Sequence, residues 1–121
     1  QDDLVVELTK SDDLSAVGIK AYIGSVDAVI SSRFHGCVSA LTQGIPCLAT
    51  SWSHKYQMLF QEYCVSQNVL DFKMDNNELE QSLILFTQSL SEQKEQYLKH
   101  SAFVKETTRH MWKQVFSILK V

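Results

Sequence analysis

The sequence lacks several features that would assign a protein to a class at once. It has no apolar run approaching the roughly 18 to 20 residues that a membrane-spanning helix requires, and no basic segment followed by an apolar core at its start. It also lacks internal repeats, low-complexity tracts and linker-like stretches. These absences exclude a membrane-spanning helix and favour a soluble protein with one globular domain.

Cysteine is scarce, and its spacing is not that of a metal or redox site. The three residues Cys37, Cys47 and Cys64 are odd in number and form no CxxC pair. All three lie in runs that we expect to be buried. We interpret them as reduced core thiols in a cytoplasmic protein, and we expect no metal site.

An excess of basic residues is also absent. The formal net charge is -3 and the isoelectric point is near 5.7, so the chain as a whole does not attract nucleic acid or an anionic membrane. A ligand that carries phosphate would therefore need a local cationic pocket. The 121 residues with 45% hydrophobic content are enough for one core.

The most informative stretch is residues 27–56. Short apolar runs alternate with polar breaks and one helical pattern, in which Cys37, Ala40 and Leu41 share a face. The spacing predicts a strand at 27–30, a polar loop at 31–36, a helix at 37–43, a strand at 45–50 and a polar loop at 51–56.

The flanking residues extend the same alternation. We expect a strand at 4–8, a helix from 12 or 13 to 24, a helix at 56–63, a strand at 65–72, a helix starting at 75–77 and a long amphipathic helix from 91 onward. This order predicts an α/β fold, a Rossmann-like three-layer parallel sheet with a long C-terminal helix, and residues 1–121 as one domain. Because position 1 is not Met and a strand pattern follows almost at once, we expect an excised piece of a longer polypeptide.

Basic side chains are concentrated in the two polar loops. In a parallel sheet, the loops that leave the carboxyl ends of neighbouring strands open on one edge, where ligands bind. Arg33, His35 and Lys55 should converge there, and in an extended segment Arg33 and His35 would point the same way. Gly36 would let a ligand approach the backbone before the next helix. We predict that these four residues bind a small, doubly charged anion.

Each of these residues also has a purely structural interpretation. An Arg at a strand end pairs with a carboxylate at least as often as it binds a ligand, and a single His is more often structural. Lys55 and His54 on a polar loop would normally be solvated, and Trp52 would normally be a packing residue. The anion hypothesis depends on three basic groups sharing one edge.

The string SRFHGCVSALTQGIPCLATSWSHKY, residues 32–56, resembles the C-terminal half of the polysaccharide pyruvyl transferase family. In that family an SRFH or SRLH segment precedes a helix of small residues, a GxP strand start and a loop with a Lys. The resemblance is close over residues 27–60 and does not reach the final long helix.

The resemblance implies a two-domain, glycosyltransferase-B-like enzyme with its cleft between two Rossmann-like halves. Such an enzyme transfers pyruvate from phosphoenolpyruvate to two hydroxyls of a saccharide as a cyclic ketal, during bacterial surface polysaccharide biosynthesis. It implies that Arg33, His35 and Lys55 bind phosphoenolpyruvate and that His35 is also a candidate catalytic acid. The chain would then be the donor-binding half, without its N-terminal domain. We expect no cofactor and a cytoplasmic location, at the inner face of the membrane if the acceptor is lipid-linked.

Two other functions stay open from the residues alone. A nucleotide-sugar glycosyltransferase shares the strand, loop, helix order, but its donor half would ordinarily carry an acidic residue near the helix start, and residues 36–43 have none. A non-catalytic assembly module could keep the anion pocket and recruit a partner through Trp112 and Phe116. Exposure of that pair would favour this third function.

Overall fold

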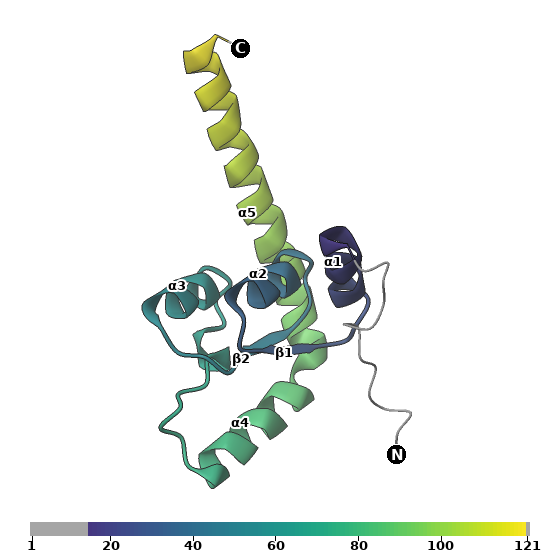
Figure 1. The fold of residues 1–121 in the computed structure, drawn as a ribbon, viewed down its shortest axis with the longest axis vertical. Helices are drawn as coiled ribbons and strands as arrows, with labels where there is room; N and C mark the ends of the chain where they lie inside the picture. Colours follow the sequence, from purple (N-terminus) through teal and green to yellow (C-terminus); the bar gives the residue numbers. More distant parts are fainter. Residues whose placement is uncertain (1–14, 121) are drawn as a thin grey trace.

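The computed structural model describes residues 15–120. Helices dominate this part of the chain, and Figure 1 shows them arranged around a small sheet. In chain order the elements are α1 (Ala16–Gly24), β1 (Val29–Ser31), α2 (Phe34–Thr42), β2 (Cys47–Ala49), α3 (His54–Glu62), the 3-10 helix η3 (Ser66–Asn68), α4 (Asn76–Gln88) and α5 (Leu90–Leu119).

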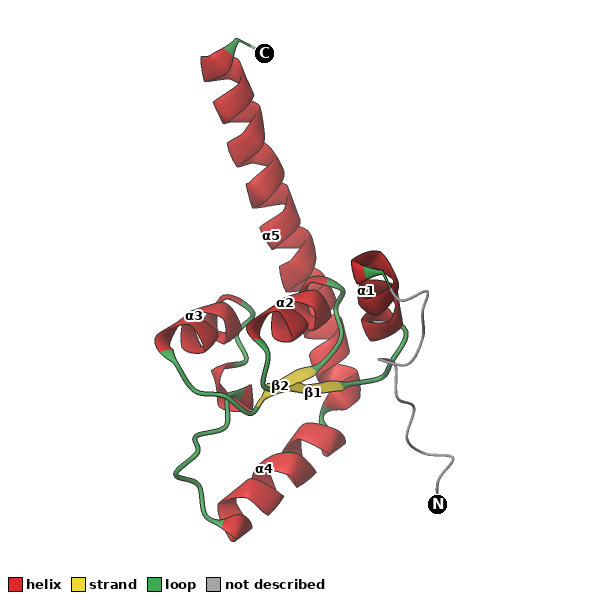
Figure 2. Ribbon diagram, in the orientation of Figure 1, coloured by secondary structure: helices red, strands yellow, loops and turns green. Residues whose placement is uncertain are grey.

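The sheet is much smaller than the sequence pattern predicted. Within residues 15–120 it consists of β1 and β2, which pair in parallel with Ser31 opposite Ala49. Each strand has three residues, and Figure 2 shows how little of the chain the strands occupy beside the helices. The expected Rossmann-like three-layer parallel sheet, and with it the half of a glycosyltransferase-B-like fold, is therefore wrong for this chain.

The strand predicted at 65–72 is also wrong. This segment forms η3 and then touches the sheet through a single parallel bridge between Ala49 and Val69. The reason is Asn68, which is buried and donates hydrogen bonds to the Cys47 carbonyl (3.1 Å) and to the Tyr97 hydroxyl (2.7 Å). A buried amide with partners on two sides turns the chain inward and interrupts strand pairing. The strand predicted at 4–8 lies outside the described residues.

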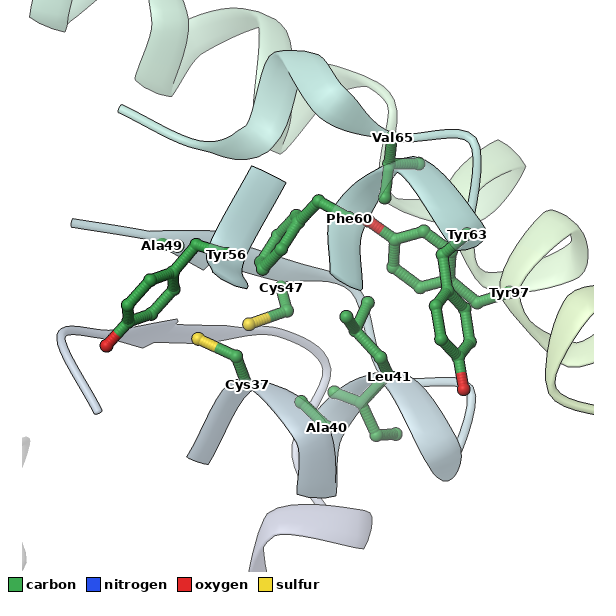
Figure 3. Packing of buried hydrophobic residues seen from close by; sticks show 11 residues of the cluster. Cys37, Ala40, Leu41, Cys47, Ala49, Tyr56, Phe60, Tyr63, Val65 and Tyr97 are labelled. Atoms are coloured by element: carbon green, nitrogen blue, oxygen red, sulfur yellow. The ribbon is translucent and has the colours of Figure 1, made fainter. Parts of the chain in front are cut away.

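β2 separates two hydrophobic clusters. Alternation along the strand directs Cys47 and Ala49 into the larger cluster and Leu48 into the smaller one, with Leu70 and Phe86. The larger cluster joins α2, α3 and α5 to the sheet, and Figure 3 shows its side chains from close by. All three residues of β2 are buried, so this strand is the centre of the fold.

The predicted apolar face of α2 is confirmed. Cys37, Ala40 and Leu41 are its buried residues, and they pack toward α3 and α5. The helix itself begins earlier than the sequence pattern predicted, at Phe34. Residues 34–36 form its first turn instead of the end of a polar loop.

The predicted long C-terminal helix is confirmed as α5. Its first part is anchored to the body through buried Tyr97 and through Ser101, whose hydroxyl donates a 2.6 Å hydrogen bond to the Thr42 carbonyl at the end of α2. Its last part extends beyond the other elements (Figure 1). There the rings of Trp112 and Phe116 stack at 5.7 Å, and both residues are 48% exposed.

The helix predicted to start near Asp75 is confirmed as well. Asp75 accepts a hydrogen bond from the Glu78 amide, and its own amide donates to the Glu78 carboxylate, each at 2.9 Å. This reciprocal capping box satisfies amides at the start of α4 that have no partner within the helix.

Candidate functional site

Two loops leave the sheet on the same edge, as the sequence analysis predicted. Because β1 and β2 are parallel, their carboxyl ends are neighbours, and the Thr50 amide donates a 3.0 Å hydrogen bond to the Ser31 carbonyl where the strands end. The loop after β1 enters α2, and the loop after β2 enters α3. We call the surface formed by residues 32–36 and 50–55 the loop edge.

Ser31 shapes the first of these loops. Its hydroxyl accepts a 3.0 Å hydrogen bond from the Arg33 amide and lies 3.2 Å from the Arg33 carbonyl, to which it can donate. The turn ends with Arg33 as the extended N-cap residue of α2, followed by the helical residues Phe34 and His35. Arg33 and His35 therefore do not lie in one extended segment, and the expectation that their side chains point the same way for that reason is wrong.

Gly36 has a packing role in this turn. A Cβ atom at this position would lie 2.7 Å from the Ser31 hydroxyl, closer than such atoms approach one another in proteins. Glycine thus allows the first turn of α2 to lie against Ser31. The ligand approach predicted for Gly36 stays a prediction.

Both helix N-termini on the loop edge lack a side-chain cap. Arg33 and Ser53 are the N-cap residues of α2 and α3, neither makes a capping hydrogen bond, and neither helix has an acid in its first turn. The amides at the start of a helix have no acceptor within it and carry a partial positive charge. By contrast, α1 is capped by Ser15 and α4 by Asp75, both away from this edge. The loop edge therefore presents unneutralised N–H groups from two adjacent helices.

Aromatic contacts join the two loops. The Lys55 ammonium lies 5.0 Å from the centre of the Phe34 ring, and this ring meets the Tyr56 ring edge to face at 5.4 Å. The Tyr56 hydroxyl donates a 2.9 Å hydrogen bond to the Ser32 carbonyl. The structure thus brings Lys55 next to the segment that carries Arg33 and His35, although about 20 residues separate them in the sequence.

The basic groups on this edge are exposed, and none of them pairs with an acid in residues 15–120. Arg33, His35 and Lys55 are all exposed, and within residues 15–120 the ion pairs join Lys99 to Glu95 and Arg109 to Glu106, all on α5. The structural interpretation of Arg33, in which an internal carboxylate neutralises it, therefore finds no partner in the described part of the chain. The site is an open surface that carries the charged side chains of Arg33 and Lys55 and the imidazole of His35.

Sequence reasoning missed the contribution of Tyr56 and Ser53. Tyr56 fits the apolar pattern of α3, so the pattern shows its burial but not the hydrogen bond of its hydroxyl. The Ser53 hydroxyl is buried without a hydrogen-bond partner among the described residues. Their position could have identified them in the sequence, because both residues lie within two residues of the predicted loop lysine, Lys55.

The cysteines lie apart from this chemistry. Cys37 and Cys47 are buried, and their sulfur atoms point toward one another in Figure 3. A hydrogen bond from the Cys47 thiol lowers the pKa of Cys37. The hydrogen bond with Cys37, together with burial, raises the pKa of Cys47. Cys64 is exposed, so the expectation that all three thiols are in the core is wrong for this residue.

Residues 15–120 contain neither a cluster of metal ligands nor a membrane-spanning helix. In residues 15–120, no group of three or more His, Cys, Asp or Glu side chains is arranged to hold a metal ion. No helix among these residues is long and apolar enough to cross a membrane.

Comparison with known families gives one match. A family model described as polysaccharide pyruvyl transferase matches residues 6–54, which include both strands, α2 and most of the loop edge. This confirms the resemblance that the sequence predicted. Neither a search of curated proteins nor a search of solved structures found a match.

Proposed function

We propose that the chain, whose residues 6–54 match the polysaccharide pyruvyl transferase family, binds phosphoenolpyruvate, the pyruvyl donor, at its loop edge. The family name denotes a transferase that acts on polysaccharides, so the acceptor is a saccharide. In this proposal the chain is the donor-binding half of the enzyme, and a second domain, N-terminal to it, completes the cleft. The reaction belongs in the cytoplasm, where phosphoenolpyruvate is available.

One observation carries the proposal. Two neighbouring helices start at this edge without side-chain caps and without acids, and basic side chains flank both starts. Phosphoenolpyruvate has a phosphate and a carboxylate close together, so it needs several N–H donors and cations in one place. Helix N-termini bind such groups well. Arg33 can hold two oxygens with its planar guanidinium, and Lys55 supplies a mobile point charge.

The reaction also requires a proton transfer and the departure of phosphate at this site. A proton must reach the methylene carbon of phosphoenolpyruvate, which becomes the methyl group of the ketal. Two sugar hydroxyls then lose their protons as their oxygens bond to the central carbon, and the bond from that carbon to the phosphate oxygen breaks, so that inorganic phosphate leaves. One released proton balances the proton gained by the methylene carbon, and the departing phosphate takes up the other. His35, in the first turn of α2, is positioned either to deliver this proton or to bind the departing phosphate.

The openness of the loop edge fits a site completed by another domain. Arg33, His35 and Lys55 are exposed, whereas a finished active site excludes water from the reacting groups. A second domain over this edge would supply the acceptor site and further acid or base groups. This part of the proposal predicts that the chain binds the donor without catalysing transfer on its own.

Ligand-dependent thermal stability tests the assignment. A ligand that binds only the folded state raises the unfolding temperature, so phosphoenolpyruvate should raise it more than the same concentration of inorganic phosphate. A nucleotide sugar should have no effect. If the nucleotide sugar alone stabilised the chain, a nucleotide-sugar glycosyltransferase would be the better assignment.

A second candidate function is favoured by one feature of α5. Trp112 and Phe116 form an exposed stacked pair on the part of the helix that extends beyond the body. This exposure favours the non-catalytic assembly module considered above, which recruits a partner through Trp112 and Phe116. The partner we propose is a second copy of the chain. Sedimentation should then show a dimer that a Trp112→Glu variant loses, without any effect of that change on anion binding.

A further inference from the structure

We infer that Tyr56 is a positioning residue for the loop edge, which fixes the direction of Arg33 through a hydrogen bond from the neighbouring loop. This inference rests on the proposed function, because it concerns the same anion site. Tyr56 is in the first turn of α3 and is 5% exposed. Its ring belongs to the core, while its hydroxyl points away from the other labelled side chains in Figure 3.

The hydroxyl reaches one particular peptide group. It donates to the Ser32 carbonyl at 2.9 Å, and the N–H of that same peptide unit, on Arg33, donates to the Ser31 hydroxyl at 3.0 Å. Both polar ends of the Ser32–Arg33 peptide are therefore held. Because a peptide unit is planar, fixing its carbonyl and its N–H fixes the plane from which the Arg33 side chain leaves.

Tyr56 also connects this peptide to Lys55. It is the next residue in the chain, and its ring contacts Phe34, over which the Lys55 ammonium lies. The Lys55 ammonium is 5.7 Å from the Tyr56 ring as well. Tyr56 therefore connects the loop after β2 to the loop after β1. Its hydroxyl sets how closely Arg33 and Lys55 can approach one anion.

Packing alone does not require the hydroxyl. A phenylalanine would fill the same volume, keep the contact with Phe34 and stay within the cluster. The function of the hydroxyl therefore lies in the hydrogen bond to Ser32.

Calorimetric titration with phosphoenolpyruvate tests this role in a double-mutant cycle. Tyr56→Phe should weaken binding by about three- to tenfold, the loss expected for one hydrogen bond that orients a charged contact. In an Arg33→Ala background the same change should weaken binding by less than about twofold, because a residue that acts through Arg33 has nothing left to position. A merely structural tyrosine would weaken binding equally in both backgrounds.

Tyr97→Phe is the matched control. Tyr97 is buried, and its hydroxyl donates a 2.9 Å hydrogen bond to the Gln93 side chain on α5, away from the loop edge. This variant should lose thermal stability but keep wild-type affinity for phosphoenolpyruvate. Equal affinity of Tyr56→Phe and wild type, or an equal loss in Tyr97→Phe, would overturn the positioning role and leave the proposed function intact. Failure of the wild-type chain to bind phosphoenolpyruvate would overturn both.

Discussion

Gly44 at the end of α2 lies directly against Leu98 on α5. A Cβ atom added at Gly44 would overlap the Leu98 side chain. The backbone of Gly44 also has a φ of +74°, a conformation that residues other than glycine rarely adopt. This contact lets the long helix approach the sheet closely enough for Tyr97 and Ser101 to be buried.

Gly44→Ala should therefore destabilise the chain by about 1–3 kcal/mol, through strained backbone and an overpacked contact. The free energy of unfolding from urea titration measures this effect. Leu98→Ala in the same chain should relieve part of the loss, since it removes the overlapping atoms. If the two losses simply added, the overlap would not be the cause.

Gly18 in α1 and Gly36 in α2 differ in their surroundings and give a paired prediction. A Cβ atom at Gly36 would lie 2.7 Å from the Ser31 hydroxyl, whereas at Gly18 its nearest neighbour would be 3.5 Å away. Gly36→Ala should force Ser31 to give up its bonds to Arg33 and weaken phosphoenolpyruvate binding severalfold. Gly18→Ala should stabilise the chain by about 0.5–1 kcal/mol and leave binding unchanged. Unchanged binding in both variants would show that the Ser31 turn does not shape the site.

Alkaline pH should destabilise the fold through its buried tyrosines. Burial raises the pKa of Tyr97, and to a lesser extent that of Tyr63, above the value of about 10 for an exposed tyrosine. The stabilisation is fully present below pH 10. Above that, the unfolded chain loses its phenolic protons first, so the free energy of unfolding falls as the pH rises.

The Tyr97→Phe variant checks this origin. It lacks one of the two described tyrosines whose pKa rises on folding, so its stability should fall less steeply between pH 10 and pH 11.5 than that of the wild type. If the free energy of unfolding fell equally steeply with pH in both proteins, groups other than Tyr97 would cause the loss of stability at alkaline pH.

The thiols should differ in reactivity. Cys64 is exposed, whereas Cys37 and Cys47 are buried, so one equivalent of an alkylating reagent should react under native conditions and three after denaturation. Mass spectrometry of the labelled peptides identifies the residue. Rapid native labelling of Cys37 or Cys47 would contradict the packing of the larger cluster.

The sequence predicted the helices better than the sheet. The apolar face of α2 and the start of α4 at Asp75 follow from periodicity and capping chemistry, which act within a few residues. The strand expected at 65–72 was inferred from apolar residues alone. Whether this segment forms a strand depends on Asn68, whose side chain donates hydrogen bonds to Cys47 and Tyr97. These partners are distant in the sequence, so a local pattern does not reveal them.

The convergence of the two loops could also be predicted, but the geometry of the candidate site could not. Parallel strands that end in basic loops indicate one shared edge, and Lys55 does lie beside the loop of Arg33. The helical position of His35 and the role of Tyr56 depend on the Ser31 turn and on a hydrogen bond between loops. Neither leaves a periodic signal in the sequence.

Isothermal titration of phosphoenolpyruvate into the chain and its loop variants tests the central claim most directly. Arg33→Ala and Lys55→Ala should each lower the affinity by roughly tenfold or more, since each removes a charge-assisted contact to the anion. His54→Ala, an exposed neighbour of Lys55, should stay within about twofold of the wild type. Equal affinities across all four proteins would contradict the account, because the two loops would then not share one anion.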